Sequence, residues 1–310
     1  MRQLPDDSSR LFRGSRLFHT VEGEGPSTVL LVHGEAGDSD DWAPQLEALG
    51  ARHRLIAPDL PGHGRSPAAR HGHTPRDLAD DLAGLLAALD TPSVIAVGHG
   101  AGAVIASVLA VERPDLVRAL VAVNPRYGLH PQHAAAMAAA VRVPDPAAAL
   151  ARSLAAEEGG AAGEPTGWLP AWHRRRALTT DGDVLVRMLT ALYHPSTGPA
   201  VRPVADAYLS RRTCPVLTVC SRRWAEARNT GPDWDRSVGS HPAGDSVLWD
   251  GVGHWPHQER FDDFNAFVLD WTGGLPATGA GADPSARQPD EVLDGFDRLD
   301  RGQFPVTRPP

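Results

Sequence analysis

The 310-residue sequence predicts an α/β fold with a mostly parallel sheet flanked by helices. Short apolar runs rich in β-branched residues alternate with helical patterns along the chain. The run at 94–97 leads through a glycine turn straight into a helical pattern at 101–111. With 42% hydrophobic and 22% charged residues, the chain is also long enough and apolar enough to bury a sizeable core.

The predicted elements follow one another in the order that parallel pairing requires. The strands are expected at 16–22, 29–32, 55–57, 94–97, 116–123, 215–219 and 247–249. The clearest helix is 74–89, because Leu78, Leu82 and Leu89 fall on one face and Thr74 can cap its first turn. Further helices are expected at 101–111 and at about 261–271.

Residues 126–205 interrupt the alternation of strands and helices. This stretch has no clear strand signal, much alanine and bulky groups around Trp168 and Trp172, which predicts a helical cap insertion. The end of the chain is Gly/Pro/Ala-rich and then mixed in charge, which predicts a disordered tail. The expected organisation is a core in two parts, 1–125 and 206–272. A helical cap at 126–205 lies between them, and a tail follows at 273–310.

The composition argues against several classes of function. A net charge of −8 is a poor match to nucleic acid or to an anionic membrane, so neither is expected as a partner. The 30 basic residues are all arginine, which excludes lysine nucleophiles and Schiff bases. Cys214 and Cys220 alone supply neither a disulfide framework nor a four-ligand zinc site, and no metal or other cofactor is expected.

Two segments bear on localisation. Residues 1–16 carry charges of both signs and no apolar run, so they do not predict a secretory signal. Residues 93–111 are nearly all apolar, but they divide into a strand, a turn and a helix, which do not cross a membrane together. We expect a cytoplasmic protein that binds a small-molecule substrate or ligand; its oligomeric state is left open.

Four segments, in order, resemble the α/β-hydrolase family, and the resemblance covers roughly residues 16–272. They are Val29-Leu30-Leu31-Val32-His33-Gly34 with Gly37 and Trp42, Asp59-Leu60-Pro61-Gly62-His63-Gly64-Arg65-Ser66, Gly98-His99-Gly100-Ala101-Gly102 and Gly251-Val252-Gly253-His254-Trp255-Pro256. The third matches the family's strained G-x-S-x-G turn, which lifts its central residue above the sheet. The resemblance implies an oxyanion hole formed by the backbone N–H groups of Ala101 and Glu35.

Two members of the family's catalytic triad are absent from their expected positions. Gly100 stands where the family has serine, cysteine or aspartate, and glycine has no side chain that can attack a substrate. Trp224 stands where the acid is expected, and Asn124 occupies the alternative acid position. Only His254 matches its family position, so the triad is degenerate. The sequence leaves open whether Glu226, Asp233 or Asp235 replaces the acid.

These departures predict that covalent acyl transfer is lost. The favoured function is a cofactor-independent, non-covalent enzyme (lyase, cyclase, isomerase or water addition) acting on a small apolar molecule. His254 would be the acid or base, joined by Glu35 if burial raises the pKa of that carboxyl. The residues expected to line the substrate pocket are Trp42, Trp168, Trp172, Trp224 and Trp255.

Three alternatives were weighed against this prediction. One is a hydrolase for esters, lactones or epoxides that uses water activated by His254. Another is a ligand-binding pseudo-hydrolase. The third is a dinucleotide-binding protein, since Gly98-x-Gly100-x-x-Ala103 fits the G-x-G-x-x-[G/A] fingerprint. That third alternative is disfavoured, because the next predicted strand ends at Asn124 without the acidic residue that binds a ribose.

Overall fold

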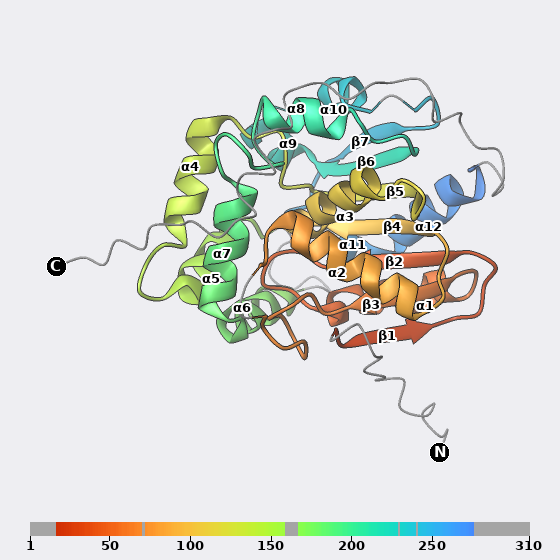
Figure 1. Ribbon diagram of the computed structural model, residues 1–310, viewed down its shortest axis with the longest axis horizontal. Coiled ribbons are helices and arrows are strands. Elements are labelled where there is room, and N and C mark those ends of the chain that lie inside the picture. Colours follow the sequence, from red (N-terminus) through yellow and green to blue (C-terminus); the bar gives the residue numbers. More distant parts are fainter. Residues whose placement is uncertain (1–16, 70–71, 159–166, 229, 240, 276–310) are drawn as a thin grey trace, which may run out of the picture. The chain divides into compact units, whose positions relative to one another are not determined.

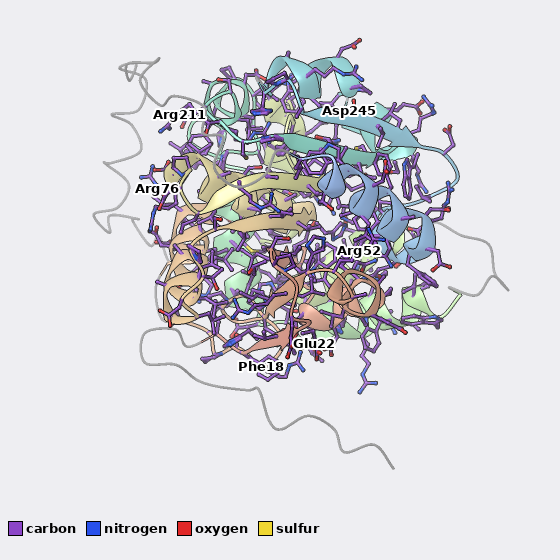
Figure 2. The ribbon with its side chains drawn as sticks, turned by 90° about the vertical axis from the view of Figure 1, so that its right-hand side faces the viewer. Phe18, Glu22, Arg52, Arg76, Arg211 and Asp245 are labelled. Atoms are coloured by element: carbon purple, nitrogen blue, oxygen red, sulfur yellow. The ribbon has the colours of Figure 1, made fainter. Side chains whose placement is uncertain are left out.

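Seven strands form one sheet in the computed structural model, in the spatial order β1-β3-β2-β4-β5-β6-β7. The structure describes residues 17–69, 72–158, 167–228, 230–239 and 241–275. The strands are β1 (His19–Glu22), β2 (Thr28–Val32), β3 (Arg54–Pro58), β4 (Val94–His99), β5 (Val117–Val123), β6 (Val216–Ser221) and β7 (Asp245–Trp249). Only the β1–β3 pair is antiparallel among these strands. Figure 2 marks the β1 edge with Phe18 and Glu22, and the β7 edge with Asp245.

The central strands are buried on both sides because helices cover both faces of the sheet. Helices α1 (Ala43–Gly50) and α12 (Phe261–Gly273) pack together on one face, and α2 (Pro75–Ala88) and α3 (Gly100–Glu112) pack together on the other (Figures 1 and 2). Trp42, Leu49 and Phe264 join the strands in the core of the first face. The predicted α/β class with a mostly parallel sheet is confirmed.

Helix α2 follows the sequence prediction closely. The Thr74 hydroxyl accepts a hydrogen bond from the Asp77 N–H, and the Asp77 carboxylate accepts one from the Thr74 N–H, which completes a capping box. Leu78, Leu82 and Leu85 are buried along its inner face. The predicted cap and amphipathic face are therefore both confirmed.

The chain between β5 and β6, residues 124–215, is mostly helical in its described part and is called the helical segment below. It contains α4 (Pro131–Ala140), α5 (Pro146–Ala155), α6 (Leu169–Thr179), α7 (Gly182–Leu192) and α8 (Val204–Leu209). Figure 1 shows α4, α5, α6 and α7 gathered beside the sheet. Because the segment leaves β5 at its carboxyl end, it lies where the loops of a parallel sheet form a site.

Several short helices were not predicted. They are the 3₁₀-helix η1 (Ser39–Trp42), α1, α9 (Arg222–Arg228), α10 (Pro232–Ser237) and α11 (Pro256–Glu259). Most are two turns or less, too short to show a clear apolar period. None of the helices in the described part of the chain is long and apolar enough to cross a membrane. Residues 276–310, which make up most of the predicted tail, lie outside the described residues, as do residues 1–16.

Candidate active site

The turn between β4 and α3 has the backbone shape that the sequence predicted. Gly100 has a φ of 54°, in the left-handed region that favours glycine. A Cβ on Gly102 would lie 2.2 Å from the carbonyl oxygen of His33, so this position also admits no side chain. The turn is thus intact as a backbone structure, with no side chain at its centre.

The carboxylate of Glu35 occupies the space in front of this turn. Its Oε2 accepts a hydrogen bond of 2.9 Å from the Ala101 N–H, and its Oε1 is paired with Nε of Arg126. A Cβ built on Gly100 would lie 2.7 Å from Glu35 Oε2. The N–H of Ala101, which the family resemblance assigns to the oxyanion hole, is therefore already bonded to a carboxylate in this structure.

The condition under which Glu35 would join His254, a pKa raised by burial, is not met. Desolvation by itself does raise the pKa of this fully buried carboxyl. The Arg126 guanidinium and the Ala101 N–H outweigh that effect, so the pKa lies below its usual value. Glu35 is therefore an ionised carboxylate at neutral pH and is not poised to donate a proton.

Arg126 joins two carboxylates at the end of β5. Its side chain is only 1% exposed, and besides Glu35 it binds Glu157, with Nη1 3.2 Å from Oε1 and Nη2 2.9 Å from Oε2. The guanidinium also lies over the ring of Trp224, 4.4 Å from its centroid. Sequence reasoning missed both Arg126 and Glu157, because neither stands in a motif.

The backbone of His254 is held by its neighbours. Its carbonyl oxygen accepts hydrogen bonds of 2.9 Å from the Asn124 side-chain amide and from the His99 ring. Asn124 also accepts a bond of 2.7 Å from the Ser221 N–H. Asn124 thus ties the ends of β5 and β6 to the His254 loop and does not contact the imidazole as an acid would.

The His254 ring faces the turn at Gly100. Its side chain is 1% exposed, and Nε2 would lie 3.5 Å from a Cβ on Gly100. On the other side, Nδ1 is 3.5 Å from Oε2 of Glu157. Neither ring nitrogen has a hydrogen-bond partner among the described residues. A buried polar ring without partners calls for an explanation.

Burial lowers the pKa of His254 well below its ordinary value. The charge of Arg126 and the nearby His99 and His257 lower it further. The imidazole is therefore neutral at physiological pH. In this state it can accept a proton, but it has none to give as an imidazolium.

None of the three carboxylates left open by the sequence contacts His254. Glu226 and Asp233 are exposed to solvent. Asp235 is buried elsewhere, where its Oδ2 accepts a hydrogen bond of 2.7 Å from the Ser246 hydroxyl. Trp224 packs against the His254 ring with 5.2 Å between ring centroids, so an indole lies where the family resemblance places the acid.

The five tryptophans assigned to the pocket are placed in three different ways. Trp224 and Trp255 both contact the His254 ring. Trp42 is fully buried in the core, and its ring packs against His257. Trp168 is 55% exposed and touches Trp172 edge-on. The structure therefore does not bring Trp42 or Trp168 to the His254 ring.

A small cavity adjoins Glu35. A cavity of about 10 Å³ is lined by Glu35, His99, His173, Trp255 and six further residues. That volume is no more than about one water molecule needs. A larger cavity of about 300 Å³ lies at the amino ends of β6 and β7, beside Asp235. Among the described residues, no group of three or more His, Cys, Asp or Glu side chains is arranged to hold a metal ion.

The parallel sheet, the strand–glycine–helix turn and the histidine loop after the last strand define an α/β-hydrolase-fold protein. Residues 27–177, just under half of the chain, match the family model described as alpha/beta hydrolase fold, and the chain has the fold of this family.

Curated relatives match shorter stretches of this chain. It is 43% identical over 110 residues to an epoxide hydrolase of Caballeronia sordidicola, covering 34% of this chain and 33% of the relative. It is 44% identical over 108 residues to a putative carbamate hydrolase RutD of Variovorax paradoxus, covering 33% and 41%. The matched segments thus span between about a third and two fifths of these relatives' length.

Solved structures match over most of the chain. The enol-lactonase from Burkholderia xenovorans LB400 has a TM-score of 0.71 at 21% identity and covers 85% of this chain and 99% of its own. A thermophilic esterase from Thermogutta terrifontis has a TM-score of 0.69 at 22% identity, covering 83% and 93%. At these identities the likeness establishes the fold alone.

Proposed function

We propose that this protein is an α/β-hydrolase-fold enzyme that acts without a nucleophile at the strand–helix turn. In this proposal, neutral His254 is the general base that removes a proton from the substrate or from water. The observation that carries the proposal is the position of Glu35: its carboxylate occupies the space where a side chain at Gly100 would project.

The same observation argues against acyl transfer. A covalent acyl intermediate needs a nucleophile and an oxyanion hole that stabilises developing negative charge. Gly100 offers no hydroxyl, thiol or carboxylate. The ionised Glu35 also takes up the Ala101 N–H and would repel an oxyanion beside it.

The surroundings of His254 support a role as a base. Its ring is neutral, and Nε2 points toward the turn without a hydrogen-bond partner among the described residues. When the ring gains a proton, the nearby Glu157 carboxylate stabilises the resulting charge. Glu35 is a fixed anion in this proposal and does not act as an acid.

A small, largely apolar substrate suits the indole rings of Trp224 and Trp255, which both contact the His254 ring. The helical segment would be the cap over this substrate. Proton removal by one base without a cofactor suits lyase, cyclase, isomerase or water-addition chemistry.

A second candidate is hydrolysis by water that His254 activates directly. It is favoured by curated relatives named as epoxide and carbamate hydrolases. The bond between the Glu35 carboxylate and the Ala101 N–H favours a third candidate, a binding protein without turnover, because it occupies the oxyanion donor that the family resemblance implies.

One experiment separates these candidates. The purified chain would be incubated with a panel of esters, lactones, epoxides and carbon acids in oxygen-18-labelled water, and products analysed by mass spectrometry. Conversion without label supports lyase, cyclase or isomerase chemistry, whereas labelled product indicates hydrolysis or water addition. For any converted substrate, His254→Ala should lower turnover roughly 10²–10⁴-fold, with little change in affinity.

The matched control is Glu226→Gln, because Glu226 is exposed and should leave turnover unchanged. A fluorophosphonate probe is expected to leave the intact mass of the protein unaltered. Stoichiometric labelling within this site, or full turnover by His254→Ala, would contradict the proposal. Tight ligand binding without conversion by either protein would favour the pseudo-hydrolase.

A further inference from the structure

We propose that Glu157, supplied by the helical segment, is the carboxylate that orients His254 in place of the acid absent from the strand ends. This inference rests on the proposed function of His254 as a base. Glu157 is a positioning residue in this scheme: it acts through the imidazole and is not required to touch the substrate.

The first support is proximity. Oε2 of Glu157 lies 3.5 Å from Nδ1 of His254, on the side of the ring away from Gly100. Among the described residues, Glu157 is the one acid with a carboxylate oxygen within 4 Å of a ring nitrogen of His254. The contact is longer than a hydrogen bond, but such contacts in unliganded sites commonly shorten when the base takes up charge.

The second support is that Glu157 is fastened in place. The His254 N–H donates a hydrogen bond of 2.9 Å to the Glu157 carbonyl oxygen. Arg126 binds both carboxylate oxygens, and Arg223 donates a bond of 2.9 Å to the carbonyl of Ala156. Three attachments therefore hold the turn after α5 against the core.

The third support is that the family's usual acid positions are otherwise engaged. The Asn124 amide bonds the backbone at Ser221, Gly253 and His254. The indole N–H of Trp224 donates to the Pro125 carbonyl at 3.2 Å. Neither side chain can accept a proton from, or fix the tautomer of, the His254 ring.

The chemical consequence concerns the tautomer of His254. A carboxylate facing Nδ1 favours the form that carries its proton there. The lone pair of Nε2 then points toward Gly100, where the proposed base must act. Without that carboxylate the ring is free to carry its proton on Nε2, and this form cannot accept a proton on the side facing the turn.

Glu157 comes from the helical segment, so the basic tautomer of His254 depends on the position of that segment. Gly100 and His254 are held by the sheet and its loops, whereas Glu157 belongs to the turn after α5 in the helical segment. His254 is therefore set in its basic tautomer only while this turn is seated on Arg126 and on the His254 loop.

The test is ¹⁵N NMR of the full chain with labelled histidine, which reports imidazole tautomers directly. His254 signals would be assigned by comparison with His254→Gln. In the unaltered protein we expect His254 to carry its proton on Nδ1. Glu157→Gln should lower the ratio of the Nδ1–H to the Nε2–H form about tenfold, because it removes the charge facing Nδ1.

Two controls isolate charge from packing. Glu158→Gln removes the neighbouring carboxylate, which pairs with His173, and should leave the His254 signals unchanged. Glu157→Asp keeps the charge and should restore most of the Nδ1–H form.

An Nε2–H tautomer in the unaltered protein would overturn the inference, even if Glu157→Gln failed to fold. So would an unchanged ratio in Glu157→Gln, or an equal fall in Glu157→Asp or Glu158→Gln. The failure of His254 as a base would appear separately, as turnover that survives His254→Ala.

Discussion

Asp59 and Glu35 are both buried carboxylates paired with an arginine at the carboxyl ends of neighbouring strands, yet their surroundings differ. Asp59 accepts bonds of 2.8 Å from the Ser39 N–H and the Arg65 N–H and one of 2.9 Å from Arg65 Nε. Beside it, both ring nitrogens of His33 are hydrogen-bonded. Glu35 is equally well bonded, but neither ring nitrogen of its neighbour His254 has a hydrogen-bond partner among the described residues.

The difference separates a paired cluster from one that holds an unpaired imidazole. A buried network whose donors and acceptors are paired holds loops together. A buried imidazole that lacks partners has been desolvated without compensation. Both ring nitrogens of the buried His257 also lack partners among the described residues, so this feature alone does not mark a reactive residue. His33 belongs to the paired cluster, and under the proposed function His254 is the reactive imidazole.

The largest expected effect is a loss of folding stability in acid, to which buried histidines near both Asp59 and Glu35 contribute. Burial lowers the pKa of His33 to about 3, and those of His63 and His99 to about 4, with His254 and His257 also well below their ordinary value. The unfolded chain takes up protons below about pH 6.5 while the folded chain does not, so stability present above that pH is lost as the pH falls. Each such histidine contributes a slope of up to about 1.4 kcal/mol per pH unit.

Urea unfolding between pH 7 and about pH 5 measures this slope. Burial raises the pKa of Asp41 to about 7, so this carboxyl takes up a proton in the folded chain over the same range and offsets the effect of about one histidine. Glu35 and Asp59 do not contribute in this range. Their pKa values are lowered too, so their contributions are lost only in stronger acid. His257→Gln, which removes one buried imidazole, should flatten the curve. A midpoint that does not move across this range would mean that the histidines are not held neutral.

The second expected effect compares the two arginines. Arg126→Met leaves Glu35 and Glu157 without their counter-charge in a buried site and should destabilise the protein by about 3–5 kcal/mol. Arg65→Met should cost only about 1 kcal/mol, because the Arg65 side chain is 43% exposed and Asp59 keeps its backbone donors. Urea unfolding of both variants gives the comparison. Equal losses would break the distinction between the two clusters.

The smallest expected effect is the coupling between Gly100 and Glu35. Gly100→Ser introduces a Cβ at positive φ, costing about 1 kcal/mol, and drives it against the Glu35 carboxylate. In Glu35→Ala that contact is absent, so the two changes should be non-additive by about 1–2 kcal/mol in a double-mutant cycle. Gly100→Ser alone should show little or no activity on p-nitrophenyl esters. Strict additivity, or rapid ester hydrolysis, would show that Glu35 does not occupy this space.

The fold was largely predictable from the sequence because its signals are local. The β-branched run at 94–97 and the capping residues Thr74 and Asp77 each specify structure within a few neighbours. The short helices α9 and α11 were missed, since less than two turns give no clear apolar period.

The candidate site was predictable only where a residue stands in a motif. Gly100, Glu35 and His254 were found in this way, but the charge state of Glu35 was not. It depends on Arg126, which is 91 positions away in the chain and becomes a neighbour only through the pairing of β2 with β4 and of β4 with β5. Glu157 carries no sequence signal at all, because the turn after α5 has neither a pattern nor a motif.

Because the Glu35 carboxylate is bonded to the Ala101 N–H, any other acceptor must compete with it for that N–H. A ligand attached to the same chain reaches its site at an effective concentration of the order of millimolar or more. Any oxygen of an incoming molecule must compete with this tethered carboxylate for the N–H. Free carboxylates and esters at lower concentrations would lose that contest. The Glu35 carboxylate in this sense already occupies the position that the family resemblance assigns to an oxyanion. Under the proposed function, the substrates would be those that can do without that N–H.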